Sequence, residues 1–234
     1  MAGWFGGILG QFDSEYGKRW KKLDNFYYTW REDGTNLKSF IKLDPIDLKL
    51  DDGTPLIIGT VYYELITETK RIVSEENLYK VQEKKGVINT HWNRFWLTGN
   101  SFIILDKSRG KERIFKIISQ ALSGSDEIIT PVEFNIKAIF DDYSPNIWLG
   151  AFKDREGNIH SGTFYGENIV DDAEMGEAYE STTHKNQVGF ITNYFEGVLK
   201  VKVTRSGYIA IYANLEETPD QAFQFIRDEL TSYI

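Results

Sequence analysis

The feature that most limits what this chain can fold into is its last stretch, residues 186–234. Runs at 187–192, 198–204 and 208–212 are rich in β-branched and aromatic residues, and glycine-containing turns separate them. This pattern predicts strands joined by hairpins. In the middle run, lysines alternate with apolar residues, so we expect one exposed and one buried face. An antiparallel sheet is therefore expected here.

An amphipathic segment follows these runs and predicts a helix. Thr218 offers an N-cap oxygen, Pro219 suits the first helical position, and Gln221 completes a capping box. Apolar residues then recur at intervals of three and four along one stripe. They are Ala222, Phe223, Ile226, Leu230, Tyr233 and Ile234. We expect this helix to cover the sheet.

A similar unit occurs earlier in the chain. Leu97-Thr98 and Phe102-Ile103 are separated by three turn residues, as Val203-Thr204 and Tyr208-Ile209 are. The helices that follow also match: Phe115, Ile118 and Leu122 are spaced like Phe223, Ile226 and Leu230. Two interpretations stay open. One is an internal duplication of a β-hairpin/strand/helix unit, and the other is two unrelated sheet-covering helices, because burial imposes such patterns by itself.

Together, the many strand signals and the few, grouped helices predict an α+β fold of mainly antiparallel sheet with two covering helices. We expect an N-terminal extension at 1–50 that packs on the fold, a first sheet-plus-helix half at 51–125 and a second at 126–234. Duplicated halves could join into one continuous sheet with both helices on one side. The opposite face would then carry Trp92, Arg94, Trp96, Lys200 and Lys202.

Local patterns give further expectations. Alternation predicts strands at 56–66 and 132–140, whereas 67–85 fits either a helix or a strand pair. The segment 167–185 has few large apolar residues and is expected to be a loop. The apolar, glycine-rich start at 1–12 is too short to span a membrane and lacks the basic start of a signal peptide. It is expected to pack on the fold, with a docking peptide as the alternative.

Composition restricts the possible functions. The absence of cysteine excludes disulfides, thiolate metal sites and a cysteine nucleophile. The net charge of −8 argues against general binding to nucleic acid or anionic membranes. However, residues 80–116 hold nine basic and three acidic residues, while 117–185 hold four basic and thirteen acidic. We expect a soluble, cytoplasmic protein without a transmembrane segment.

The basic segment 80–116 contains the main candidate for binding. Exposed aromatic residues beside cations can stack bases while the cations hold phosphates. The candidates are His91, Trp92, Arg94, Trp96, Lys107, Arg109, Lys111 and Arg113. In a strand, however, alternate residues point to opposite faces, so some of these residues are expected to be core. A structural role, nucleic-acid contact and a protein interface all stay open.

Patterns for catalysis and metal binding are weaker. Asp52 (or its neighbour Asp51), Glu68 and Lys70 resemble the acid and Glu-x-Lys set of a metal-dependent nuclease. Clustered carboxylates at Asp171, Asp172 and Glu174 could chelate a hard cation, although a solvated loop is the commoner explanation of such a run. The three histidines lack helical zinc spacing.

These observations favour a non-catalytic, intracellular binding or scaffold protein that acts through protein-protein contacts with a partner or by self-association. No cofactor is expected. One alternative is a nucleic-acid-binding protein that uses the basic aromatic segment 80–116. A second is a Mg-dependent, nuclease-like enzyme.

Overall fold

The computed structural model confirms the α+β class: it is mostly antiparallel sheet, with helices packed on it. The residues that it describes are 5–75, 78–99, 101–106, 109–153, 160–173, 175–180, 182, 184–213 and 218–234. Among them, no helix is both long and apolar enough to cross a membrane.

The strands are β1 (Phe5–Gln11), β2 (Tyr27–Glu32), β3 (Thr35–Leu43), β4 (Leu48–Lys49), β5 (Pro55–Glu75), β6 (Leu78–Thr98), β7 (Phe102–Leu105), β8 (Thr130–Pro131), β9 (Ile147–Phe152), β10 (Gly162–Tyr165), β11 (Lys185–Tyr194), β12 (Gly197–Thr204) and β13 (Tyr208–Ile211). The helices are α1 (Ser14–Gly17), α2 (Lys111–Ser123), α3 (Ile136–Tyr143), α4 (Met175–Glu180) and α5 (Pro219–Phe225). Shorter turns are η1 (Trp20–Leu23), η2 (Ile169–Asp171), the π-helical η3 (Ile226–Leu230) and η4 (Thr231–Tyr233).

β1 lies in the middle of the sheet, whose order is β10-β9-β11-β12-β13-β1-β7-β6-β5-β3-β2. Phe5 is opposite Ile211 on β13, and Leu9 is opposite Ile104 on β7. Phe5, Ile8 and Leu9 are buried, as expected for a segment that packs on the fold, but residues 5–11 form a central strand that connects its two parts. The glycines of this run fit that place, since a Cβ on Gly7 would lie 1.9 Å from a backbone oxygen of β7.

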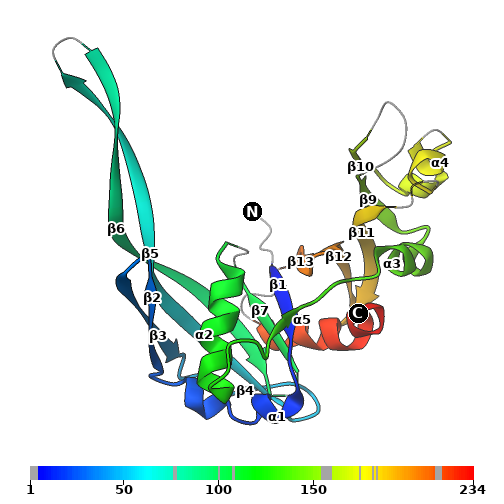
Figure 1. Ribbon diagram of the computed structural model, residues 1–234. Helices are drawn as coiled ribbons and strands as arrows, with labels where there is room; N and C mark the ends of the chain where they lie inside the picture. Colours follow the sequence, from blue (N-terminus) through cyan, green and yellow to red (C-terminus); the bar gives the residue numbers. More distant parts are fainter. Residues whose placement is uncertain are drawn as a thin grey trace.

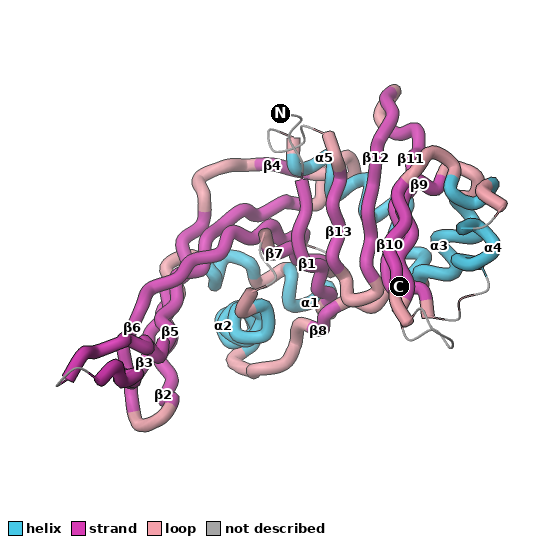
Figure 2. The backbone as a smooth tube through the Cα atoms, turned by 90° about the horizontal axis from the view of Figure 1, so that it is seen from above, coloured by secondary structure: helices cyan, strands magenta, loops and turns pink. Residues whose placement is uncertain are grey.

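α2 and α5 cover opposite faces of the sheet, as Figure 2 shows from above. Phe115 and Ile118 of α2 share one core cluster with Ile103 of β7. Phe223 of α5 belongs to the other cluster, which contains Ile104. Because neighbouring residues of a strand point to opposite faces, the two clusters are separated by the sheet.

The expectation of both helices on one side is thus wrong, and so is the single opposite face. Trp92 and Arg94 alternate with Phe95, which packs on the α2 side, so they lie on the other side. Lys200 and Lys202 alternate with Val201, which belongs to the α5 cluster, so they lie on the α2 side. The sheet itself is continuous.

The two matching hairpins flank β1. β6 and β7 lie on one side of it, and β12 and β13 lie on the other. In each hairpin a threonine hydroxyl accepts a backbone N–H four residues later: Thr98 from Phe102 and Thr204 from Tyr208, both at 3.1 Å. The local geometry of the two turns is therefore alike, while the internal duplication stays a hypothesis.

The predicted strand at 132–140 is wrong: residues 132–135 belong to no strand, and α3 begins at Ile136. The Asn135 side chain caps this helix by accepting the N–H of Ala138 at 3.1 Å. Ile136, Ile139 and Phe140 are buried, and their spacing places them on one side of the helix. The apolar residues at alternate positions also fit a strand, so the hydrophobic pattern allows either structure. The Asn135 cap favours the helix.

Two smaller expectations also need correction. The segment 167–185 is not simply a loop: η2 and α4 lie in its described part, and Ile169 and Tyr179 are buried. α5 begins at Pro219 as predicted, but the Thr218 side chain makes no capping hydrogen bond.

β5 and β6 form a hairpin that projects from the body of the molecule (Figure 1). β3 pairs with β5 only as far as Tyr63, and β7 pairs with β6 only from Phe95 onward. The backbone beyond Thr67 and before Val87 is therefore a two-stranded ribbon, which we call the arm. The ambiguous segment 67–85 is thus a strand pair.

Candidate functional site

Four aromatic residues form a row across adjacent strands of the sheet. Tyr27 of β2 is opposite Phe40 of β3, Phe40 is opposite Tyr62 of β5, and Tyr62 is opposite Trp92 of β6. Directly opposed residues share a face, and neighbouring strands lie about 4.8 Å apart, so the row is about 14 Å long.

This row is exposed on the face of β2, β3, β5 and β6 opposite α2, which we call the open face. Tyr27 is 55% exposed, Tyr62 39% and Trp92 54%, while Phe40 is half-buried. Large aromatic side chains that stay this accessible on part of a sheet that no described helix covers are a feature of contact surfaces.

Cations lie next to the row. Lys42 of β3, Thr60 of β5 and Arg94 of β6 form the adjacent row on the same face. Arg94 is held in place by an ion pair with Asp44 at 3.0 Å, and its guanidinium lies 5.5 Å from the Trp96 ring. Lys42 and Arg94 both stay exposed. The aromatic row therefore has a positively charged border.

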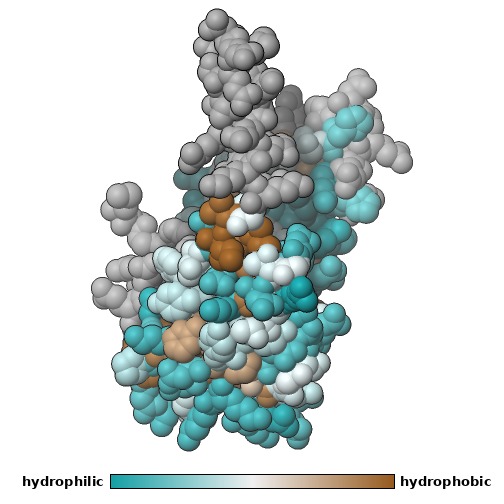
Figure 3. Space-filling view, turned by 60° about the vertical axis from the view of Figure 1, so that its left-hand side comes forward, coloured by the Kyte–Doolittle hydropathy of each residue, from teal (hydrophilic) through white to brown (hydrophobic). Residues whose placement is uncertain are grey.

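On its other side the row leads toward the arm. Glu64 accepts the backbone N–H of Lys38 at 2.9 Å, which ties β5 to β3 where their pairing ends. The next residues on this face are Ile66 and its partner Ile88, which is 45% exposed. Figure 3 shows hydrophobic side chains gathered where the described residues meet those drawn in grey.

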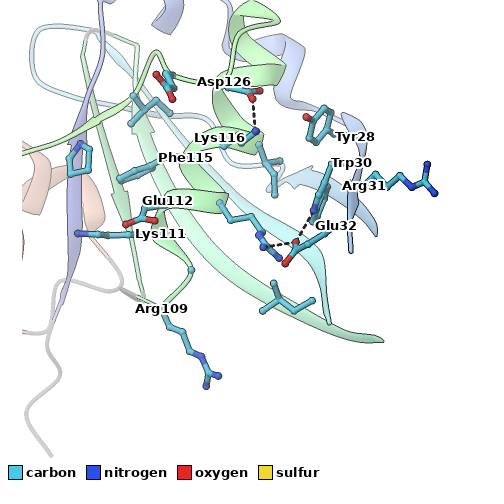
Figure 4. A pocket seen from close by; sticks show the side chains of 17 residues that line it. Tyr28, Trp30, Arg31, Glu32, Arg109, Lys111, Glu112, Phe115, Lys116 and Asp126 are labelled. Atoms are coloured by element: carbon cyan, nitrogen blue, oxygen red, sulfur yellow. Dashed lines mark hydrogen bonds and ion pairs between the residues drawn. The ribbon is translucent and has the colours of Figure 1, made fainter. Parts of the chain in front are cut away.

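The α2 side of the same strands carries a groove of about 930 Å³, the α2 groove (Figure 4). Two ion pairs bridge it: Arg113 with Glu32 at 2.7 Å, and Lys116 with Asp126. The Lys116 ammonium holds the pKa of Asp126 below its usual value. The groove is lined by Tyr28, Trp30, Arg31, Glu32, Leu65, Arg109, Gly110, Lys111, Glu112, Arg113, Phe115, Lys116, Ile117, Asp126, Glu127, Ile129 and Pro131.

Aromatic stacking shapes the wall of the α2 groove. The ring centroids of Tyr28 and Trp30 are 5.9 Å apart at an interplanar angle of 19°. Arg113 lies 5.5 Å from the Trp30 ring, and the Trp30 indole N–H donates to Glu32 at 3.3 Å. Two of its cations, Arg113 and Lys116, are thus engaged by carboxylates of the groove, and Arg113 also by a ring.

Tyr63 and His91 stack at 5.9 Å beside the start of α2. Burial raises the pKa of the Tyr63 hydroxyl, and the nearby Arg113 and Arg109 oppose this increase. A Cβ on Gly110 would lie 2.9 Å from that hydroxyl, and Gly110 has a φ of +76°, so glycine suits this close approach. Through this stacking, the His91 ring forms part of the packed side of the sheet that faces α2.

The eight candidate binding residues do not gather on one surface. Trp92 and Arg94 lie on the open face, whereas His91 lies on the α2 side. Trp96 is only 9% exposed and packs edge-on against Phe5 at 5.1 Å. Arg109, Lys111 and Arg113 line the α2 groove, and Lys107 falls outside the described residues.

The nuclease set is not assembled. β5 is one continuous strand from Pro55, so its residue 68 lies about 40 Å from the turn that carries Asp52, at ~3.3 Å per residue. The side chains of Glu68 and Lys70 are not among those that the structure describes. Asp52 accepts the Thr54 N–H at 2.8 Å and pairs with Arg227 at 3.3 Å. It therefore has a structural role in its turn.

The predicted cation site is also not assembled in the part of the chain that can be described. Asp171 and Asp172 lie in and after η2, and Glu174 is outside the described residues. Within these residues, no group of three or more acidic or histidine side chains is placed to hold a metal ion.

Sequence reasoning missed the members of the row on β2, β3 and β5. Tyr27, Phe40 and Tyr62 come from segments whose patterns looked indistinct or simply strand-like. A usable signal was present, since β2 carries aromatic residues at consecutive positions and must therefore place some on each face. The register that aligns the row comes only from the folded chain.

Comparison with known proteins gives no further guide, because no protein-family model, curated protein or solved structure matches this chain.

Proposed function

We propose that the protein is a non-catalytic binding protein that holds a protein partner on its open face. The aromatic row of Tyr27, Phe40, Tyr62 and Trp92 carries this proposal. Tyrosine and tryptophan are the residues that most often dominate the binding energy of protein interfaces, and a polar rim typically surrounds them.

The border of the row supports the same function. Arg94 is oriented by Asp44 and Trp96, so little side-chain entropy is lost when it contacts a partner. Ile88 extends the apolar surface toward the arm. The open face thus has an aromatic centre, an apolar extension and a cationic border. This is the composition of a docking surface.

The test compares proteins retained from native lysate by the tagged chain and by its variants. Trp92→Ala and Tyr62→Ala should each reduce retention of the partner about tenfold, as expected for central interface aromatics. Tyr165→Ala is the matched control, because Tyr165 is 69% exposed but lies on β10 at the far end of the sheet. If no retained protein depends on Trp92 and Tyr62, the proposal fails.

A second candidate function is nucleic-acid binding, which the row of Lys42, Thr60 and Arg94 beside the aromatics favours. Bases could stack on the aromatic rings while the cations contact phosphates. Fluorescence anisotropy with single- and double-stranded DNA and RNA at two salt concentrations distinguishes it. Binding that weakens with salt and with Arg94→Ala would support it, and no binding at low salt would exclude it.

A further inference from the structure

β2 forms one end of the sheet: in the described part of the chain, β3 is its only strand neighbour. Natural proteins usually shorten such edges or place charges in their middle, because free backbone groups invite another strand. β2 is six residues long, and its centre is Tyr28-Thr29-Trp30, with charges only at Arg31 and Glu32. This edge is therefore well suited to pairing.

The hydrogen bonds to β3 identify the backbone groups that face outward. Ile41 N donates to the oxygen of Phe26 at 2.9 Å, so the even-numbered residues of β2 bond to β3. Along an antiparallel strand, the backbone groups of successive residues point alternately toward one neighbour and toward the other. The N–H and C=O groups of Tyr27, Thr29 and Arg31 therefore point away from β3 and out of the sheet.

We propose that β2 pairs antiparallel with β2 of a second copy of this chain, about a two-fold axis at Thr29. The two sheets then continue into one another. This interface uses the edge of the sheet, so of the aromatic row it involves only Tyr27 and leaves Phe40, Tyr62 and Trp92 uncovered.

The sequence of β2 is complementary to itself in this register. Thr29 faces Thr29 of the second copy, Tyr27 faces Arg31, and Tyr28 faces Trp30. Threonine pairs and aromatic pairs are favourable across strands, and a cation beside an aromatic ring adds to them. A register centred on Arg31 would instead place two arginines opposite each other. Charge thus favours the axis at Thr29.

The α2 groove gives the second copy room. Tyr28 and Trp30 point into this space of about 930 Å³, as Figure 4 shows for their side chains. In the dimer, Tyr28 and Trp30 of the second copy lie beside them on the same side of the sheet. A strand from another protein would satisfy the same backbone groups but would leave the wild-type chain a monomer.

The test uses the absence of cysteine from the chain. Thr29→Cys places a single thiol on the two-fold axis, where the Cα atoms of a hydrogen-bonded pair lie about 5.5 Å apart, within the range for a disulfide. Thr163→Cys is the matched control, because Thr163 is an exposed threonine on β10, the strand at the other end of the sheet.

Under mild oxidation, Thr29→Cys should form a disulfide-linked dimer at least about tenfold faster than Thr163→Cys. Sedimentation velocity of the wild type should show a monomer–dimer equilibrium. Thr29→Lys, which opposes two ammonium groups on the axis, should weaken it about tenfold while circular dichroism stays unchanged. Equal cross-linking rates for the two cysteine variants, or a wild type that is monomeric at all concentrations, would overturn the proposal.

Discussion

Trp92 and Trp96 lie on the same face of the same strand, yet they have different roles. Trp96 is 9% exposed and packs against Phe5, whereas Trp92 is 54% exposed in the aromatic row. Strand alternation gives both the same direction, and the neighbours that cover each position decide burial. The sequence alone treats the two residues alike.

Substitution by alanine should separate these roles. Trp96→Ala should lower the free energy of unfolding by about 3 to 5 kcal/mol, because it leaves a cavity in the core. Trp92→Ala should lower it by less than about 1 kcal/mol. Urea denaturation of both variants measures the difference, and equal losses would show that Trp92 is also a core residue.

Arg227, which lies near the C-terminus, contacts three carboxylates. Its guanidinium contacts Asp51 and Asp228 at 2.7 Å and Asp52 at 3.3 Å. The hydrogen bond from Arg227 is the main cause that holds the pKa values of Asp51 and Asp228 below 3.8. The pKa of Asp52 is lowered mainly by Thr54.

These shifts predict a pH dependence. A carboxyl whose pKa is lowered in the folded state stabilises the fold above pH 3.8, and this contribution is lost as pH falls through the folded pKa. Arg227→Ala should therefore flatten the loss of stability below about pH 4, as measured by urea denaturation at several pH values. Lys137→Ala, which removes the exposed ion pair with Asp141, is the control. An unchanged slope in Arg227→Ala would contradict the assignment.

Among the elements, α3 shows how a short polar signal can outweigh a hydrophobic pattern. Apolar residues at 132, 134, 136 and 140 fit a strand, but Asn135 caps a helix at its first turn. A helix begins where a side chain satisfies its free N–H groups, so one residue decides the structure of the next eight.

Removing this cap should measure its contribution. Asn135→Ala should reduce the free energy of unfolding by about 1 kcal/mol, because the Ala138 N–H loses its acceptor. Asn135→Asp keeps an acceptor oxygen and should stay close to the wild type. Thermal unfolding of both variants gives the comparison, and equal loss in both would exclude capping as the cause.

The arm is expected to be an element that the body does not need. Within the described residues, the backbone of β5 beyond Thr67 pairs with β6 alone. Replacing residues 68–86 with Asn-Gly, which forms a tight hairpin turn, should leave the melting temperature within a few degrees of the wild type. Scanning calorimetry measures it. A large decrease would mean that the arm contacts the body.

The sequence predicts those parts of the fold that depend on interactions between residues close together in the chain. The hairpins at 198–212 and the helices at 111–122 and 219–230 follow from local periodicity and turn residues, and the structure contains them. The central position of β1 depends on pairing with distant strands, which no local pattern records. The same limit applies to the open face, where Trp92 and Arg94 were candidates but Tyr27 and Tyr62 were not.

For the molecule as a whole, β1 is the connection on which both parts of the sheet depend. Ile8 belongs to the core cluster beneath α2, and Phe5 and Leu9 belong to the cluster beneath α5. Without this strand, β7 and β13 would both become edges. Each cluster would also lose the side chains that β1 contributes to it.

Deleting residues 1–12 should therefore abolish cooperative unfolding, not merely lower the melting temperature. A synthetic peptide of residues 1–12 added to the shortened chain should restore it, because a strand can be donated from outside to an open sheet. A scrambled peptide is the control. Cooperative unfolding of the shortened chain alone would show that the sheet does not depend on β1.

The central place of β1 also sets the time at which this protein can finish folding. Phe5 pairs with Ile211, so β1 leaves the ribosome roughly 10 to 40 s before β13 at ordinary rates of synthesis. For about the first half of that interval the apolar, glycine-rich strand has neither of its final neighbours, and for the second half it has β7 but not β13. Newly made chains thus expose at least one edge of this segment to chaperones and to other nascent chains until β13 has been made.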